Sequence, residues 1–220
     1  MKRALAALEV AVGLILLCKN NPIYSYKFPK VAGNPELPKA TDIFRVGSFT
    51  KVFTNMMLLM MRDAGLVSLD TQVTDLLPNL NMPNPFPVNN RGITLKMLGS
   101  HTSGLQGWGP CHSPCNITTA EMVERLNSIP VIYPPLRYVH YSNLGLALLG
   151  RALETVTPDE QSYEDYVTQN VLQKLGMNQS GFDITRETRS QMAVGYNVVD
   201  GHLIPTEELP ALGWMVMSSS

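Results

Sequence analysis

The sequence predicts a mixed α/β fold, with strands near both ends of the chain and helices between them. Near the N-terminus, two runs rich in apolar and aromatic residues are separated by Asn-Asn-Pro; apolar residues recur at helical spacing in 49–63, and an alternating pattern surrounds Asp200-Gly201. The 220 residues are 45% hydrophobic and 16% charged, which is globular composition. This length bounds the chain to one ordinary domain or two small ones.

The N-terminal apolar runs have two interpretations. Residues 10–19, 20–22 and 23–31 are typical of strand, turn and strand, and the first run is continuously apolar, as in a sheet covered on both faces. Lys2 and Arg3 ahead of an apolar stretch are instead typical of a signal peptide. The hairpin is favoured because Glu9 interrupts the stretch, because no A-x-A-like cleavage site follows, and because the run is too short to span a bilayer.

The next segments are predicted to be mainly helical, with loops rich in proline and asparagine. A helix is expected from about residue 49 to 63, with Gly65 as its C-terminal stop. Residues 67–78 are expected to form a turn and a short helix, and 78–90 a loop.

The second half of the chain continues this helical pattern and then returns to strands. Thr94 is expected to cap a short helix that runs through Leu98, and Thr118 or Thr119 to start another. Two longer helices and a final hairpin are then predicted, at residues 142–156, 162–175 and 193–205.

Composition and cysteine placement restrict the function class. The net charge of −1 and the scattered basic residues exclude the basic surface of a nucleic-acid-binding protein, so no nucleic-acid partner is expected. Cys111 and Cys115 lie close together beside the sequon at Asn116, which predicts a local disulfide and a secreted or extracellular-facing protein; a cytoplasmic or organellar location is the alternative. Zinc binding by this pair with His112 lacks a fourth ligand, so no metal is expected.

Ser48 and Lys51 form the first candidate for chemistry. Ser48 is expected to open the helix that follows, and Lys51 then lies in its first turn, where the helix dipole favours anions over cations. Residues three apart share a helix face, so the amine can accept the proton that a serine hydroxyl must lose to become a nucleophile. The structural alternative is a helix cap followed by a solvent-facing lysine.

Tyr141 and Asn143 form the second candidate, at the start of the predicted helix at 142–156. A tyrosine beside a lysine ammonium can have a lowered pKa and relay protons, and an asparagine amide can bind a substrate carbonyl or amide. The structural alternative is that Asn143 only caps the helix while Tyr141 packs beneath it.

Taken together, four ordered stretches resemble one family. Residues 44–70 (FRVGSFTKVFTNMMLLMMRDAGLVSLD) resemble the nucleophile helix of serine β-lactamases and penicillin-binding peptidases, in the class C-like branch that includes animal β-lactamase-like proteins. The stretches SHTSGL at 100–105, YSNLGLALLGRALE at 141–154 and YEDYVTQNVLQKLGMNQSGF at 163–182 match further landmarks of that branch in the same order. No G-x-S-x-G elbow, typical of α/β-hydrolases, is present.

The resemblance implies a β-lactamase/DD-peptidase-like α/β sheet flanked by helices, with a helical subdomain. Within a single partial domain at 1–220, residues 1–65 would be the hairpin and nucleophile helix, 66–190 the mainly helical part, and 191–220 the start of the return to the sheet. It also implies that Ser48 is acylated, that Lys51 is its base, that Tyr141 carries a proton to the leaving group and that Asn143 binds the substrate amide. The backbone N–H of Ser48 would supply half of an oxyanion hole.

The chain departs from the family at its C-terminal side. No K-T-G or H-x-G motif, which that family carries on a late strand, follows Tyr141 before Ser220. We therefore expect a fragment that lacks C-terminal strands, and expect residues 1–220 alone to associate and to turn over no β-lactam.

Two function classes follow from this pattern. The first is a serine hydrolase that acts on a small-molecule or peptide-like amide or ester through an acyl-enzyme, without a cofactor. The second is a catalytically inactive β-lactamase-like binding or scaffold protein. Membrane association is not expected, and neither substrate identity nor oligomeric state is predicted by the sequence.

Overall fold

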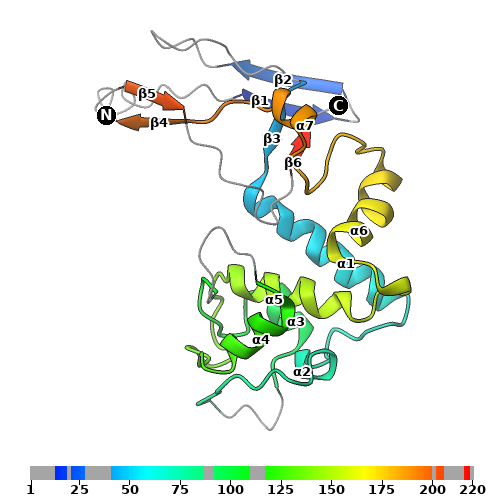
Figure 1. Ribbon diagram of the computed structural model, residues 1–220, viewed down its shortest axis with the longest axis vertical. Helices are drawn as coiled ribbons and strands as arrows, with labels where there is room; N and C mark the ends of the chain where they lie inside the picture. Colours follow the sequence, from blue (N-terminus) through cyan, green and yellow to red (C-terminus); the bar gives the residue numbers. More distant parts are fainter. Residues whose placement is uncertain are drawn as a thin grey trace.

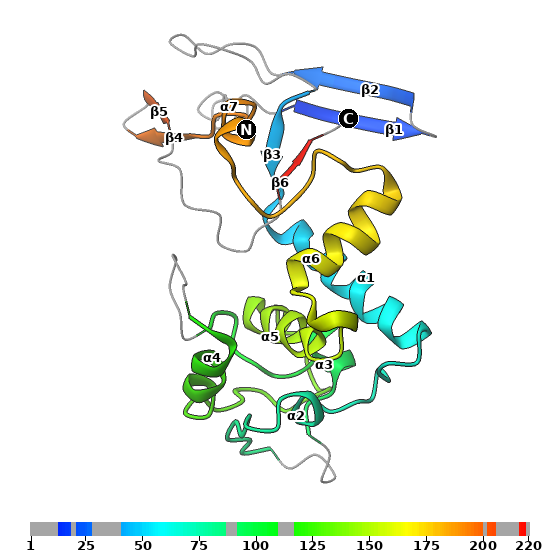
Figure 2. The same cartoon turned by 45° about the vertical axis from the view of Figure 1, so that its right-hand side comes forward.

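The computed structural model describes residues 41–86, 92–109 and 117–195 in full, and only the backbone of strand residues 13–18, 21–27, 196–199, 202–205 and 216–218. The described strands gather at one end of the molecule and most of the helices at the other (Figures 1 and 2). Helix α1 (Thr50–Asp63) runs from the strand end into the helical part. The predicted mixed α/β fold is therefore confirmed.

Two hairpins at the strand end match the sequence predictions. Strands β1 (Gly13–Cys18) and β2 (Asn21–Lys27) pair antiparallel, with an irregularity in register between Leu16 and Leu17. Strands β4 (Tyr196–Val199) and β5 (His202–Pro205) pair antiparallel around the predicted turn. A continuously apolar run before Asn-Asn-Pro and an alternating pattern around Asp-Gly were thus sufficient signals for the two hairpins, although β2 begins at Asn21, inside the predicted turn at 20–22.

A third pair of strands leads directly to the candidate site. Strand β3 (Ile43–Arg45) pairs antiparallel with β6 (Val216–Ser218), so that Ile43 lies opposite Ser218. The backbone of Ile43 also bonds a second segment, because its N–H donates to Gln191 O at 2.9 Å and its carbonyl accepts from Ala193 N at 2.9 Å. The strand that precedes the first candidate residues is therefore held by two distant parts of the chain.

Helix α1 forms because its buried residues recur at helical spacing. The buried side chains lie on one stripe of the helix and are Thr50, Phe53, Thr54, Met57, Leu58 and Met61. At the C-terminal end, Gly65 takes a φ of 74°, its N–H donates to Arg62 O, and Leu66 N donates to Met61 O. This left-handed ending satisfies the last carbonyls and confirms Gly65 as the stop.

The remaining helices are short apart from α5 (Asn143–Glu154). Thr94 accepts a hydrogen bond from Met97 N at 3.3 Å, and Thr118 forms a capping box with Glu121, so both predicted helix starts are confirmed. The predicted helix at 162–175 is helical throughout but changes type along its length. In chain order the other elements are α2 (Val73–Leu76), α3 (Leu95–Gly99), α4 (Thr119–Leu126), the 3₁₀ turn Pro158–Glu160, α6 (Tyr163–Val167), the π-helical segment Thr168–Leu172, the 3₁₀ turn Gln173–Leu175 and α7 (Arg186–Ser190).

Helix α5 lies at the centre of the helical part, between α1, α3 and α4 in Figure 1. Most of its residues are buried, and Leu148, Leu149 and Leu153 are fully buried. A helix with such a wide apolar surface is stable only when other helices pack against it, which is the arrangement observed. Tyr163 of α6 packs against Gly150, where an added Cβ would lie 3.4 Å from the ring.

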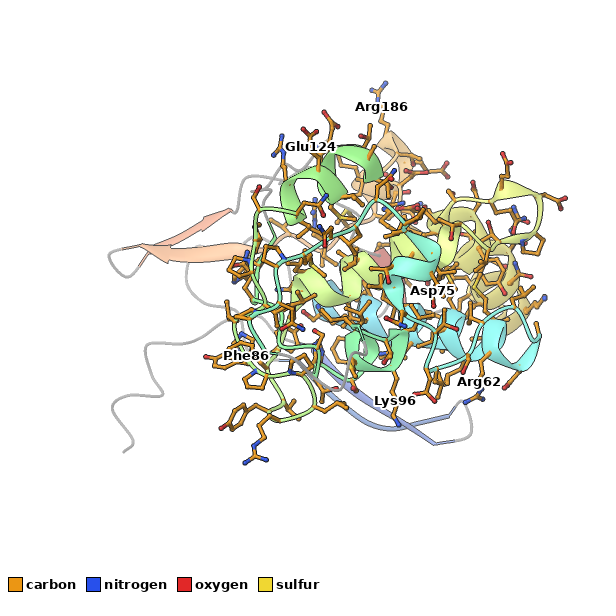
Figure 3. The ribbon with its side chains drawn as sticks, turned by 90° about the horizontal axis from the view of Figure 1, so that it is seen from below. Arg62, Asp75, Phe86, Lys96, Glu124 and Arg186 are labelled. Atoms are coloured by element: carbon orange, nitrogen blue, oxygen red, sulfur yellow. The ribbon has the colours of Figure 1, made fainter. Side chains whose placement is uncertain are left out.

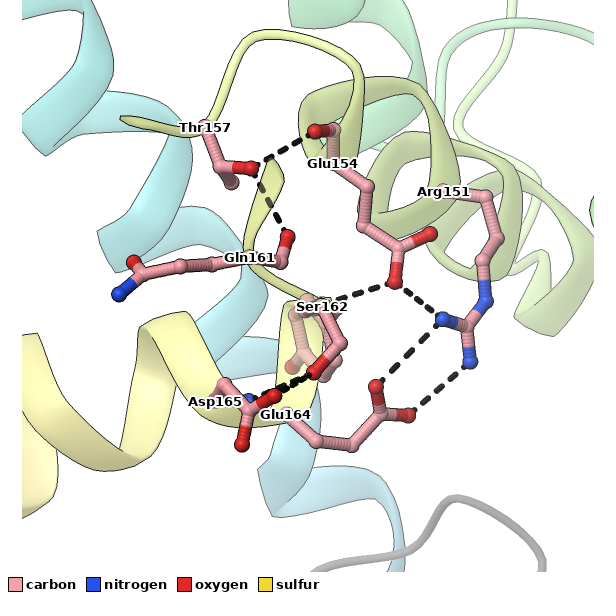
Figure 4. Close-up of polar contacts among 8 residues, drawn as sticks. Arg151, Glu154, Thr157, Gln161, Ser162, Glu164 and Asp165 are labelled. Atoms are coloured by element: carbon pink, nitrogen blue, oxygen red, sulfur yellow. Dashed lines mark hydrogen bonds and ion pairs between the residues drawn. The ribbon is translucent and has the colours of Figure 1, made fainter. Parts of the chain in front are cut away.

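A polar network joins the end of α5 to the start of α6 (Figure 4). Arg151 pairs with Glu154 on its own helix and with Glu164 on α6, the latter at 3.0 Å. Glu154 also accepts a hydrogen bond from Tyr163 N at 2.8 Å, and Ser162 caps α6 by accepting from Asp165 N. These contacts fix α6 relative to α5, and α6 in turn packs against α1.

The outer surface of the helical part carries the charged side chains. Arg62, Lys96 and Glu124 of the helical part point into solvent, and so does Arg186 of α7 at the strand end (Figure 3). None of the helices that the structure describes is both long and apolar enough to span a membrane.

Candidate active site

Ser48 lies in a 3₁₀ turn, Gly47–Phe49, that runs directly into α1. The expectation that Ser48 caps the start of the helix is therefore wrong. Val46 precedes the turn and no side chain caps it, because the backbone is already helical at Ser48 and its hydroxyl makes no capping bond. The Ser48 side chain is exposed and its oxygen remains available for other partners.

Lys51 and Tyr141 both reach the Ser48 hydroxyl oxygen. Lys51 Nζ, one helical turn along, donates to Ser48 Oγ at 3.1 Å. The Tyr141 phenol, from a loop far along the chain, donates to the same oxygen at 2.7 Å. Lys51 Nζ also lies 4.9 Å from the centre of the Tyr141 ring, within range of a cation–π contact. Ser48 and Lys51 of the first candidate and Tyr141 of the second therefore form one cluster.

Tyr141 is held at the point where the loop enters α5. Ser142 caps this helix by accepting from Gly145 N at 2.9 Å, and its hydroxyl donates to Gln106 O at 2.6 Å. Burial acts to raise the pKa of Tyr141, but the hydrogen bonds to Lys51 and Ser48 and the lysine charge outweigh it, and the pKa is lowered from its ordinary value. A phenol with a lowered pKa beside a serine can exchange a proton with it.

Asn143 is the first residue of α5 and not its cap. Its backbone N–H donates to Gly107 O at 2.8 Å. The side-chain oxygen Oδ1 is buried and has no hydrogen-bond partner among the residues that the structure describes. A buried acceptor without a donor costs free energy, so this atom is a ready position for a donor from another group.

His101 is a neighbour of the site that the sequence did not reveal. Its Nδ1 accepts a hydrogen bond from Ser142 N, in the segment that carries Tyr141, at 3.1 Å. Its ring also lies 4.6 Å from the Tyr141 ring, centre to centre. The only available signal was a histidine inside SHTSGL, and a short motif does not reveal which distant loop it meets.

The surroundings of the site are open and partly apolar. Phe49, next to Ser48, and Trp108, in the loop that precedes α4, are each 72% exposed. No cluster of three or more metal-binding side chains occurs within the described parts of the chain. Cys111, His112 and Cys115 lie outside the described residues, so the disulfide and the extracellular location stay predictions.

Comparison with known proteins agrees with this arrangement. The family model described as "Beta-lactamase" matches residues 16–219. Beta-lactamase-like protein 4 of Dictyostelium discoideum is 37% identical over 151 residues, which cover 64% of this chain and 26% of that protein.

Two solved structures share the fold. The octameric penicillin-binding protein homologue from Pyrococcus abyssi aligns with a TM-score of 0.76 at 23% identity, over 99% of this chain and 52% of its own. The class C beta lactamase from Rhodobacter sphaeroides aligns with a TM-score of 0.73 at 23% identity, over 99% of this chain and 60% of its own. The chain thus spans about a quarter of the curated relative and a little over half of each solved chain. Since the family model matches nearly all of its residues, the chain belongs to the beta-lactamase family.

Proposed function

We propose that this chain carries the acylation site of a serine hydrolase, with Ser48 as the nucleophile and Lys51 and Tyr141 as its proton-transfer partners. One observation carries the proposal: a single hydroxyl oxygen, Ser48 Oγ, receives both the lysine at 3.1 Å and the tyrosine at 2.7 Å. A structural serine needs neither partner, and the helix dipole disfavours a cation such as Lys51 in the first helical turn.

The chemistry follows from these contacts. Ser48 Oγ attacks the carbonyl carbon of an amide or ester, and its proton passes to the Lys51 amine, which has to be uncharged at this step to act as the base. In the tetrahedral intermediate the bond to the leaving nitrogen or oxygen breaks, and Tyr141 delivers a proton to that atom. Water then attacks the resulting acyl-serine with the same groups in reverse order, which releases the acid and restores the hydroxyl.

The backbone of the Ser48 turn supports the negative charge that develops on the substrate oxygen. Ser48 lies among the first residues of a helical segment, where N–H groups have no acceptor within the helix and the dipole favours an anion. We assign the Ser48 N–H as one oxyanion donor. Loss of a single such donor typically reduces kcat by about 10²–10³-fold, so a second donor matters greatly for turnover.

Asn143 is the proposed contact for the substrate amide. Its Oδ1 is an acceptor without a described partner, at the start of the helix that follows Tyr141. A substrate N–H is one donor that fits it, which favours amides with an N–H next to the reacting carbonyl. Because this oxygen is buried, the residues that cover it have to shift for a substrate N–H to reach it.

The test is covalent labelling of Ser48 by a fluorophosphonate and by a penicillin-type probe, located by mass spectrometry of the labelled peptide. The 220-residue chain is compared with a version extended by the corresponding downstream segment of a curated relative. Labelling of Ser48 in the extended version alone would mean that the 220 residues lack an oxyanion donor, whereas labelling of another residue would mean that the nucleophile is wrong. Ser48→Ala is expected to abolish labelling. Ser128→Ala, an exposed serine after α4, is the matched control and is expected to label normally.

Labelling that survives Ser48→Ala would show that the nucleophile lies elsewhere. A folded protein that labels in neither form would favour the alternative of an inactive binding or scaffold protein.

A further inference from the structure

The backbone of the loop at residues 100–107 forms hydrogen bonds with the segment that carries Tyr141. Leu136 N donates to Thr102 O at 2.8 Å, and Ile132 N donates to Gly104 O at 2.9 Å. Gly104 has no alternative at this position, because an added Cβ would lie 2.0 Å from the Tyr133 carbonyl oxygen. The loop therefore holds the segment at 131–144 through backbone hydrogen bonds, and these continue as far as Tyr141.

Among these contacts of the loop, those of His101 lie closest to Tyr141. Its carbonyl accepts from His140 N at 2.8 Å, and its Nδ1 accepts from Ser142 N at 3.1 Å. These are the residues directly before and after Tyr141. The His101 ring lies against the Tyr141 ring itself, with centres 4.6 Å apart and planes 33° apart. One residue thus fixes the backbone on both sides of Tyr141 and one face of its ring.

The backbone of His101 adopts a conformation that has a cost. Its φ is 59°, in the left-handed region that residues other than glycine rarely adopt, and where asparagine, aspartate and histidine are the better tolerated ones. Such a conformation persists only where the surrounding structure enforces it, and it occurs often at active sites. Here it directs the histidine ring across to Tyr141 while its carbonyl meets His140.

We propose that His101 is a positioning residue that holds the Tyr141 phenol against Ser48 and Lys51, an inference that rests on the proposed function. Without the His101 ring and its Nδ1 acceptor, Tyr141 loses the contacts that hold its phenol beside Lys51 and Ser48. Half of the Tyr141 surface is exposed, so few other side chains confine it.

The protonation state of His101 agrees with this role. An Nδ1 that accepts a hydrogen bond requires the neutral ring with its proton on Nε2. Burial, and then the charge of Lys51, lower the pKa of His101, which keeps the ring neutral at physiological pH. Lys51 on α1 supplies the charge that acts on His101, and the Tyr141 ring, in the loop before α5, lies against it.

The experiment separates the ring from the acceptor. His101→Asn keeps an acceptor and tolerates the left-handed backbone but removes the ring. His101→Phe keeps a ring but leaves Ser142 N–H without its acceptor. His140→Asn is the matched control, since it makes the same exchange beside Tyr141 at a ring that contacts Tyr133 instead.

Two measurements are made on each variant. The first is the pKa of Tyr141, from phenolate absorbance as a function of pH, with the same variant carrying Tyr141→Phe subtracted because the chain has 8 tyrosines. The second is the rate of Ser48 labelling as a function of pH. Both His101 variants are expected to raise the pKa of Tyr141 towards its ordinary value and to slow labelling, by up to about 10²-fold for a displacement of about 1 Å. His140→Asn is expected to change neither.

The two proposals fail in distinguishable ways. If Ser48 is never labelled, the proposed function fails, and the Tyr141 titration, which needs no turnover, still reports on His101. An unchanged Tyr141 pKa in both His101 variants, with a cooperative melt, would overturn the positioning role. Equal effects of His140→Asn would overturn it as well, since any change in the loop would then suffice.

Discussion

Two tyrosines bond to hydroxyls of the same helical segment, and their pKa values shift in opposite directions. Tyr163 lies 2.8 Å from Thr54 Oγ1 in the core and is 7% exposed, while Tyr141 donates to Ser48 Oγ at 2.7 Å and is 50% exposed. Burial raises the pKa of Tyr163 to about 12, only partly offset by the hydrogen bond from Thr54. The pKa of Tyr141 is lowered, because Lys51 lies beside it.

The comparison shows that a tyrosine–hydroxyl hydrogen bond does not by itself make a reactive site. Tyr163 joins α6 to α1 and stays protonated, so its bond stabilises the fold. Tyr141 shares its hydroxyl partner with an ammonium group, and its pKa is lowered, so it loses its proton more readily than an ordinary tyrosine. The neighbouring cation and the exposure to solvent distinguish Tyr141 from Tyr163.

The largest expected difference is in reactivity. Tyr141→Phe should slow labelling of Ser48 by about 10²–10⁴-fold, the usual contribution of a positioned proton-transfer group. Tyr163→Phe should leave the labelling rate of the folded protein unchanged. Both are measured with the fluorophosphonate probe at neutral pH in whichever form of the chain labels. Equal losses in the two variants would remove the distinction.

The next effect is on stability at alkaline pH. Because the folded-state pKa of Tyr163 is raised above the unfolded value near 10, its contribution is fully present below about pH 10 and is lost as pH rises towards about 12. The loss amounts to about 2–3 kcal/mol. Denaturant unfolding from pH 9 to 12 should show this decline in the parent and a shallower one in Tyr163→Phe. At neutral pH the variant should cost about 1 kcal/mol, from the hydrogen bond to Thr54.

Removal of the lysine charge tests the cause of the Tyr141 shift. Lys51→Met keeps a chain of similar length, so the raising effect of burial on the pKa of Tyr141 remains while the hydrogen bond and charge of Lys51 are lost. The pKa of Tyr141 should rise, and the pKa of His101, which Lys51 also lowers, should rise with it. Tyrosine absorbance and histidine NMR titrations measure the two. A Tyr141 pKa unaffected by the substitution would mean that Ser48 alone accounts for the shift.

The smallest effect is that of salt. Lys51 and Tyr141 are only partly buried, so raising the ionic strength from about 0.01 M to about 1 M should screen their interaction and shift the pKa of Tyr141 slightly upward. Below the folded-state pKa, the stabilisation that comes from a depressed tyrosine pKa is already absent, so neutral-pH stability should not change through this group. The pKa of Tyr163 is set mainly by burial and should not respond to salt.

Much of the fold was predictable from local signals. The stripe of Phe53, Met57 and Met61 predicted α1, Gly65 predicted its end, and Thr118 with Glu121 predicted the start of α4. These features are encoded within a few residues, where spacing and capping chemistry decide the structure. The pairing of β3 with β6 was not predictable in this way, because three-residue strands far apart carry no pairing signal of their own.

The site divides along the same line. Ser48 and Lys51 were found from their spacing on one helix, and Tyr141 and Asn143 from their position before another. That Tyr141 meets Ser48 depends on tertiary packing, and was expected only through the family resemblance. The contact of His101 with Tyr141 and Ser142 was missed, because a left-handed histidine and its distant partners have no signature in a single sequence.

The double attachment of β3 also affects the order of folding. Ribosomes make the N-terminal residues first, and α1 can form from local contacts as soon as it emerges. The two described segments that bond or pair with Ile43, residues 191–193 and 216–218, are made only later. Contacts between such distant residues form slowly, since a long loop must close first. The nascent chain can therefore contain α1 before the strand that precedes Ser48 has reached these two segments, so that the backbone leading into Ser48 takes its final position late in synthesis.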